Sequence, residues 1–600
     1  MIDQKSIAVL PFDNLSSDAE NEYFADGMTE EIINALSQIE GLKVTARTST
    51  FVFKNLKQDI RHIGNELGVS TVLEGSIRKS SNRVRITAQL IRTDNGFHLW
   101  SENFDRELTD VFALQDEISL LIADKIRENF GHLEINEDLF HHAAEDTQAL
   151  IYCQKARYHY NQWNPENINL SIQYYEKARA LDDQLIDAYI GLADSYSFLA
   201  VAGFAPREEA WGKSIEAIEK AKTINAQNAS LNYMLANQAL YTEANFLKAI
   251  SHCQQSLVVN PTLPEARRLM AFLNILRGDL EIAAEHLRYV VSIDPINDET
   301  AFFEAYLLYR AGKFEESEKK LRGLLDKNPS NLPAITTLAY NLIMTGQYSS
   351  IKQLLNEAPE GLIIPDEKLG LSCLAEVKER GQDITPDLLI QLKQNASENT
   401  SFQAHAYLFL VYVNLEELDS AMEVLQKLFD IKSSILLLSY GDPLAAKIFS
   451  HPSYEEIHKK IYNEEPINIP RKQGKSVSLE KEAIASALER LEDIISAKQP
   501  YLDPKLSLRA LAETIELHPN QLSWLLNDKI GKNFNDFING YRLAAFQERA
   551  KDPSLGHLTL LGLALESGFS SKSVFNEFFK KHTGKTPKAW VSEAKKAWDH

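Results

Sequence analysis

Polar and basic side chains recur along one face of a segment near the carboxyl end, Ser571–His582. On a helix that turns about 100° per residue, Lys572, Ser573, Asn576 and Lys580 lie on one side. Hydroxyl and amide groups on one helix face can read base edges in the DNA major groove, while ammonium groups hold the phosphates. The spacing predicts a recognition helix. The alternative is an ordinary solvated helix face.

The other face of this segment is apolar and must anchor it. Val574, Phe575 and Phe578 fall on that side, together with Ser571 and His582. A turn at residues 567–569 precedes the helix; Gly568 is expected to take a left-handed conformation there, and Ser570 is expected to cap the helix. A helix, a short turn and a second helix form a helix-turn-helix unit.

An earlier stretch, LSLRALAETIELHPNQLSWLLNDKIGKNF, repeats the pattern. Ser507 can cap its first helix, the turn falls at residues 516–518, and Pro519 opens its second helix. The intervening FNDFINGYRLAAFQERAK is long enough for one connecting helix. The side chains expected to form the two cores are Leu511, Leu522, Leu525, Phe537, Phe569, Phe575, Phe578 and Trp590.

This pair of units, with its GF turn, FFKK run and GKTP ending, resembles the AraC-type DNA-binding domain over about residues 476–596. The resemblance implies that both second helices face outward and enter successive major grooves on one face of a duplex. It assigns base-facing positions to Asn520, Gln521, Ser523 and Trp524 in the first unit and to Lys572, Ser573 and Asn576 in the second. Lys580 is expected at the phosphates. Trp524 and Glu577 depart from the family, which often has a basic residue at those positions.

Charge is distributed unevenly along the chain. The whole chain carries a net charge of −21, whereas the residues from Lys475 onward hold 18 Lys and Arg against 16 Asp and Glu. The end therefore carries +2 and the remainder −23. An acidic remainder would suppress indiscriminate adhesion to DNA, and a basic end fits phosphate contact.

The first ~130 residues mix strand and helix signals. KSIAVLPF is a short apolar run, residues 27–39 have helical apolar spacing, and two alternating strands follow with turns at SSN and DNG. AVLPFDNLSSDAENEYFADGMTEEI, VTARTSTFVF, VLEGSIR and LWSENFDREL resemble the TolB-like amino-terminal domain of bacterial regulatory proteins. The resemblance implies a small α/β domain used for assembly or sensing.

A 34-residue interval marks the middle of the chain. Pro261, Pro295 and Pro329 recur at this interval, as do Gly278, Gly312 and Gly346 and the small residues Ala249, Ala283 and Ser317. This is the repeat length of the tetratricopeptide helix pair, in which each pair buries one face against the next to form a solenoid with a concave groove.

The predicted organisation is multidomain, α/β followed by all-α. We expect a TolB-like α/β domain at 1–130, a tetratricopeptide solenoid at 145–462, a linker at 463–475 and an AraC-type double helix-turn-helix domain at 476–600. The linker prediction rests on NEEPINIPRKQGKSVS, which has two prolines, a glycine and no apolar periodicity.

Other classes of protein are disfavoured. The longest apolar runs are too short to span a bilayer, and the amino terminus does not resemble a signal peptide, so a cytoplasmic location without membrane contact is expected. The three cysteines lack ligand spacing, which disfavours a disulfide framework or a metal site. No phosphate-binding loop or hydrolase motif is present. We therefore expect no catalytic residues, no metal and no cofactor.

Two functions remain in competition. The first is a transcription regulator that binds double-stranded DNA through its basic end, with a protein or peptide partner in the repeat groove and dimerisation implied by the family. The second is an assembly scaffold whose terminal helices merely cap the solenoid. Salt-dependent affinity for duplex DNA distinguishes them.

Overall fold

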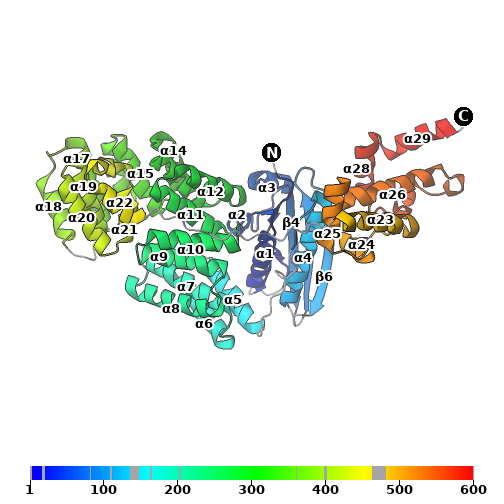
Figure 1. Ribbon diagram of the computed structural model, residues 1–600, viewed down its shortest axis with the longest axis horizontal. Helices are drawn as coiled ribbons and strands as arrows, with labels where there is room; N and C mark the ends of the chain where they lie inside the picture. Colours follow the sequence, from blue (N-terminus) through cyan, green and yellow to red (C-terminus); the bar gives the residue numbers. More distant parts are fainter. Residues whose placement is uncertain are drawn as a thin grey trace.

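A computed structural model describes residues 3–16, 21–80, 83–107, 111–135, 147–161, 165–201, 204–359, 361–397, 402–462 and 481–598 of the chain. The amino-terminal sheet and its helices occupy the centre of the molecule, with the repeat helices on one side and the carboxyl-terminal helices on the other (Figure 1). The α/β part therefore separates the two helical parts.

The α/β part is built on one mixed sheet. Its strands run in the order β3-β1-β4-β5-β6, with β2 paired to β4; β1 is parallel to β3 and β4, whereas β4, β5 and β6 are antiparallel. The elements are β1 (Ser6–Val9), β2 (Asp13–Asn14), α1 (Glu22–Ser37), β3 (Lys43–Val44), α2 (Arg47–Phe51), α3 (Ile60–Leu67), β4 (Thr71–Ser80), β5 (Arg83–Arg92), β6 (His98–Glu107) and α4 (Val111–Phe130). The mixed α/β class predicted for this region is confirmed.

Helix α4 has two functional faces. Ile118, Ile122 and Ile126 are at most 1% exposed and join the apolar cluster beneath the sheet, because they recur every four residues on one side. Near its carboxyl end, Arg127 and Glu128 are also buried, at 1% and 3% exposed. Buried charges require partners. Arg127 pairs with Asp124, and Glu128 with Lys125, within α4. Both side chains also bond to another part of the chain.

The middle of the chain is a series of antiparallel helix pairs. Gly278, Gly312 and Gly346 all have positive φ, and Ala249, Ala283 and Ser317 are fully buried, so the 34-residue interval corresponds to repeated turns and close helix crossings. The helices are α5 (Thr147–Tyr160), α6 (Pro165–Leu181), α7 (Ile186–Val201), α8 (Arg207–Asn225), α9 (Ala229–Tyr241), α10 (Phe246–Val259), α11 (Pro264–Arg277), α12 (Leu280–Ile293), α13 (Asp298–Arg310), α14 (Phe314–Lys327), α15 (Leu332–Met344), α16 (Tyr348–Glu357), α17 (Pro365–Arg380), α18 (Pro386–Asn395), α19 (Phe402–Asn414), α20 (Leu418–Asp430), α21 (Ser434–Tyr440), η3 (Pro443–Ser450) and α22 (Tyr454–Tyr462).

The repeat helices hold the α/β part through a buried carboxylate. Asp294, which follows α12, accepts hydrogen bonds from the hydroxyls of Thr48 (2.5 Å) and Ser49 (2.7 Å) and from Arg268 (3.1 Å). Ile296 packs against the apolar cluster that β1, α3 and β4 share. This attachment is therefore both polar and apolar.

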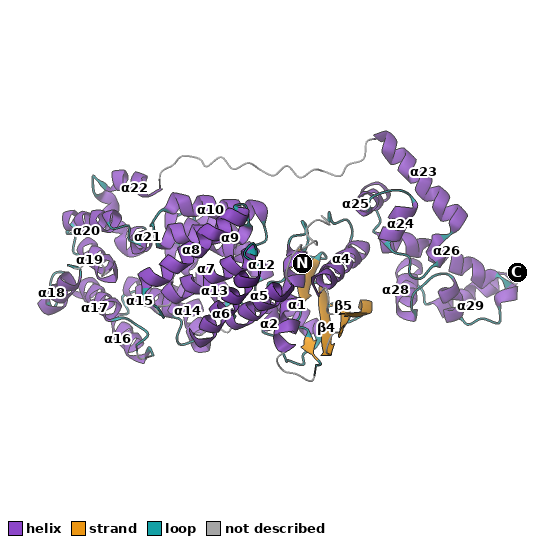
Figure 2. Ribbon diagram, turned by 90° about the horizontal axis from the view of Figure 1, so that it is seen from below, coloured by secondary structure: helices purple, strands orange, loops and turns teal. Residues whose placement is uncertain are grey.

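The carboxyl-terminal part contains two compact cores joined by a long helix. Predicted core residues of both units are buried, and Trp590 packs partly buried against the second core. The elements are α23 (Lys481–Lys498), η4 (Pro500–Leu502), α24 (Leu508–Thr514), α25 (Pro519–Trp524), η5 (Leu525–Ile530), α26 (Phe534–Lys551), η6 (Pro553–Leu555), α27 (Leu560–Glu566), α28 (Lys572–Thr583) and α29 (Pro587–Trp598). Figure 2 shows α25 beside α4 and α29 on the far side of the carboxyl-terminal helices.

The predicted linker, residues 463–475, and the predicted start of the last domain at residue 476 lie outside the described residues. Among the helices that are described, none combines the length and apolarity of a bilayer-spanning segment.

Candidate nucleic-acid interface

The second recognition helix, α28, has the expected two faces. Phe575, Phe578 and Phe579 are buried in the second core, whereas Lys572, Ser573, Asn576 and Lys580 are exposed. The phenylalanine rings pack on Phe546 of α26 and on Phe569 of the turn, which fixes the helix axis. The polar face therefore projects from a rigid support.

The start of α28 differs by one residue from the prediction. Ser571, not Ser570, is the N-cap, and its hydroxyl accepts a hydrogen bond from the Val574 amide at 3.3 Å. Gly568 has a φ of +92°, as expected for a left-handed turn residue. Assigning Ser571 to the apolar face was wrong because its side chain caps the helix end.

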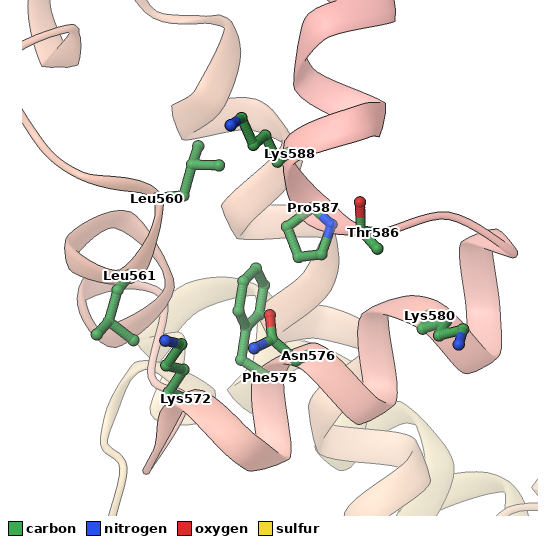
Figure 3. A pocket seen from close by; sticks show the side chains of 9 residues that line it. All are labelled: Leu560, Leu561, Lys572, Phe575, Asn576, Lys580, Thr586, Pro587 and Lys588. Carbon is green, nitrogen blue, oxygen red and sulfur yellow. The ribbon is translucent and has the colours of Figure 1, made fainter.

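A shallow hollow of about 390 Å³ lies between α27, α28 and α29 (Figure 3). Its lining includes the apolar Phe575 and Pro587 and three lysines, Lys572, Lys580 and Lys588; the Lys580 side chain lies apart from the other two. In Figure 3, Lys572 and Lys588 lie on opposite sides of the two rings, and Asn576 sits next to Phe575. Such a basic surface with an amide group at its centre suits a phosphate backbone and a base edge.

The first unit is capped as predicted. The Ser507 hydroxyl accepts from the Ala510 amide, and His518 and Gln521 form a reciprocal capping box at the start of α25. The Gln521 carboxamide oxygen, assigned to a base in the sequence analysis, accepts from the His518 amide at 3.1 Å. Gln521 and Trp524 are partly exposed, and the Lys529 ammonium lies 5.0 Å from the Trp524 ring centroid.

Two positions of the first recognition helix are covered. Asn520 is 6% exposed and Ser523 is 0% exposed, so the expectation that α25 presents both to solvent is wrong for this structure. The reason for Asn520 is docking of the α/β part: Asn520 Oδ1 accepts from Arg127 Nη1 at 2.6 Å and from the Ile135 amide at 3.3 Å. Its Nδ2 donates to the Ile135 carbonyl at 3.0 Å.

Carboxylates of α4 engage the helix beside α25. Glu128 Oε1 accepts from the backbone amide of Leu508 at 2.8 Å, at the amino end of α24. Asp124 accepts from Arg509 Nε at 3.1 Å and also pairs with Arg127. Glu128 therefore meets a backbone donor at a helix amino end, and Asp124 lies between two guanidinium groups.

The contact extends beyond α24 and α25. Asn533 and Asn535, around the start of α26, donate to the carbonyl and side-chain oxygen of Asn129, each at 2.9 Å. Arg92 of β5 forms an ion pair with Glu577 of α28 at 2.9 Å. Glu577, a departure from the family pattern, therefore has an intramolecular partner.

Within the described parts of the chain, no three His, Cys, Asp or Glu side chains are grouped as metal ligands would be. Cys153, Cys253 and Cys373 are buried, and burial raises the pKa of each thiol; for Cys253 and Cys373 it reaches about 12. These thiols are therefore poor nucleophiles and suit a packing role.

Comparisons with known proteins match the two ends of the chain. Residues 3–121 match a family model described as HilA/YgeH-like transcriptional regulator, second domain, and residues 511–593 match one described as helix-turn-helix domain. A transcriptional regulator domain and a helix-turn-helix domain in one chain support a DNA-binding transcription regulator. The model matched at the amino end is not a TolB-like one, so that resemblance stays a prediction.

One curated relative shares only part of this chain. It is named putative adenylate cyclase 3, from Rhizobium meliloti (strain 1021), and is 55% identical over 122 residues. The match covers 20% of this chain and 21% of the relative. This chain therefore spans about a fifth of the length of that relative.

Solved structures with likeness to the chain include repeat proteins. A tetratricopeptide repeat protein from Parabacteroides merdae is 12% identical, and the match covers 47% of this chain and all of that one; yeast Tom70 is 14% identical, with 53% and 68% covered. Both have a TM-score of 0.30. The evidence for the repeats therefore remains the 34-residue interval and the packing of the helix pairs themselves.

Proposed function

We propose that the chain is a sequence-specific DNA-binding transcription regulator whose carboxyl-terminal units bind duplex DNA of the operator. The exposed polar face of α28 carries the proposal, because Lys572, Ser573 and Asn576 project from a rigid phenylalanine core beside two further lysines. Asn576 would contact a base edge, and Lys572, Lys580 and Lys588 would contact phosphates.

The rest of the chain would act as the sensor or partner-binding module. The proposal keeps the predicted boundaries: a TolB-like domain at 1–130, a repeat solenoid at 145–462, a linker at 463–475 and an AraC-type domain at 476–600. A peptide or protein domain in the repeat groove is the proposed partner, and a homodimer is the proposed assembly. This function requires access to chromosomal DNA, hence the cytoplasm, and no catalytic residue or cofactor.

The test measures affinity of the full chain for duplexes selected from a random-sequence pool, as a function of salt. Replacing Lys572 by alanine is expected to lower the salt slope by about 0.9, the value for one phosphate contact. Asn576→Ala is expected to cost about 1 to 3 kcal/mol and to relax the preferred base at one position. Lys320→Ala, which removes a solenoid lysine paired with Glu304, is the matched charge control.

Two outcomes would contradict the proposed DNA-binding function. Should the full chain bind no duplex with a salt-dependent affinity, or should Lys572→Ala and Lys320→Ala behave alike, the assembly-scaffold alternative would replace this proposal.

A further inference from the structure

The contacts of Asn520 resemble those that an asparagine makes with adenine. An asparagine reads the major-groove edge of adenine by accepting from N6 and donating to N7. Here the Ile135 amide donates to Asn520 Oδ1 at 3.3 Å, and the Ile135 carbonyl accepts from Nδ2 at 3.0 Å. The backbone amide and carbonyl of one residue, Ile135, thus present the donor and acceptor of a base edge.

The carboxylates of α4 take the place of phosphates in the same contact. Helix amino ends and arginines are common phosphate ligands in DNA complexes. In this structure Glu128 accepts from the amide at the amino end of α24, and Asp124 pairs with Arg509. Groups suited to a DNA backbone are therefore occupied by acidic side chains.

The contact is also polar enough to separate. Among the described residues, the apolar cluster of the first helix-turn-helix unit contains no residue of the α/β part, and the cluster beneath the sheet contains none of the unit. On the opposite side, by contrast, Ile296 of the repeat region packs into a cluster of the α/β part. Separation at α4 would expose polar groups that water can solvate. The helix-turn-helix part can therefore leave the α/β part more easily than the repeat region can.

We infer that this structure is an autoinhibited state in which α4 and Ile135 mimic DNA on the first recognition helix. The inference rests on the proposed function and adds its regulation. A duplex cannot reach Asn520 while Ile135 and Arg127 hold it, whereas Lys572, Ser573 and Asn576 stay exposed. The closed chain binds DNA through one unit; the open chain binds through both.

The test opens the contact in the full chain with Arg127→Leu, which removes the guanidinium bonded to Asn520. Loss of a positive charge should by itself weaken DNA binding, so a gain of affinity has the opposite sign to the charge effect. We expect at least a 10-fold gain for duplexes selected from a random-sequence pool. The selected site should lengthen from one half-site to two, about 10 base pairs apart.

The matched control is Arg106→Leu, an exposed arginine of the same domain that pairs with Glu117 and has no bond to the helix-turn-helix part. It loses the same charge, so it should give no gain of affinity and should leave the site length unchanged. Hydrogen exchange at the Leu508 amide reports the opening directly, because Glu128 protects that amide in the closed form.

A second arm locks the contact, because Arg127 is 1% exposed and its replacement could impair folding. The side chains of Asn129 and Asn535 are hydrogen-bonded at 2.9 Å, so in the Asn129→Cys, Asn535→Cys chain a short thiol-reactive cross-linker can join the two introduced thiols. The native cysteines are buried. We expect the linked chain to select one half-site only, while each single variant treated with the reagent matches the wild type.

The outcomes separate the inference from the function. If wild type and Arg127→Leu bind equally tightly, or if the linked chain selects two half-sites, autoinhibition is wrong and DNA binding stands. If neither wild type nor any variant binds duplex DNA, the proposed function itself is wrong.

Discussion

The two helix-turn-helix units use the same turn but place it in different surroundings. In the first, the Leu517 amide donates to the Ala512 carbonyl at 2.9 Å; in the second, the Phe569 amide donates to the Ala564 carbonyl at 3.1 Å. The residue before each amide has positive φ, +57° at Glu516 and +92° at Gly568. The two turns therefore have the same backbone conformation and the same hydrogen bond.

What lies behind the turn explains why the residues differ. A Cβ on Gly568 would lie 2.1 Å from the Tyr501 carbonyl oxygen, so only glycine fits against η4. The Glu516 side chain is 86% exposed, with Arg490 at 3.6 Å. The second turn is therefore an internal joint that holds the two units together, whereas the first faces solvent.

The recognition helices differ the other way round: here the helix of the first unit is the more buried one. The first, α25, has Asn520 covered by the α/β part, whereas Lys572, Ser573 and Asn576 of α28 are exposed, although Glu577 on the same helix pairs with Arg92. In the first unit the turn is exposed and the second helix, α25, is covered. In the second unit the turn is buried and the second helix, α28, is accessible. The contact that holds the two units together is therefore at the Gly568 turn, whereas the contact with the α/β part is at α25.

The largest effect should come from Gly568→Ala. A left-handed alanine costs roughly 1 to 2 kcal/mol, and the contact with the Tyr501 carbonyl adds about 1 to 3 kcal/mol. Hydrogen exchange of the α28 amides should therefore speed up strongly. Glu516→Ala, at the matching turn position, should change stability by less than about 0.5 kcal/mol. Equal effects of the two variants would show that the buried joint does not exist.

Local features of this part could be predicted from sequence, whereas docking could not. The Ser507 cap, the left-handed Gly568 and the buried phenylalanines depend on neighbours within a few residues. The local sequence pattern therefore predicts them. The bond from Arg127 to Asn520 joins residues 393 positions apart, and periodicity carries no information on such pairs.

One signal for the docking was present in the sequence. Asp124, Arg127 and Glu128 stand at i, i+3 and i+4, so they share one face of a helix whose other face is apolar. The sequence analysis made no prediction for these three residues, and all three side chains are buried in the structure. The four-residue spacing could have predicted a contact face, although not its partner.

A smaller effect, of opposite sign, is expected for Glu516→Gly. Glycine relieves the positive φ of Glu516 but loses more entropy on folding, so the net gain in the free energy of unfolding should be about 0.5 kcal/mol. The exposed pair with Arg490 contributes little to set against this gain. The denaturation midpoint of the first unit measures it. A loss of stability would mean that the turn is not strained at Glu516.

The smallest effect concerns pH and acts on the covered unit alone. His132 lies in the segment that leads from α4 to Ile135, and burial, with the nearby Arg127 and Lys5 charges, holds the pKa of its imidazole below the ordinary value of 6.5. The neutral ring is favoured in the folded chain. Its contribution to stability is therefore complete above pH 6.5 and is lost as the pH falls below that value.

Between about pH 7.5 and about pH 5.5, exchange of the Ile135 and Leu508 amides should speed up in the wild type. His132→Gln, which cannot gain the proton, should show a smaller change over the same interval, and the α28 amides should respond alike in both chains. If His132→Gln loses protection as steeply as the wild type, the imidazole is not the group that senses acid at this contact, and the difference between the covered and open units does not extend to pH.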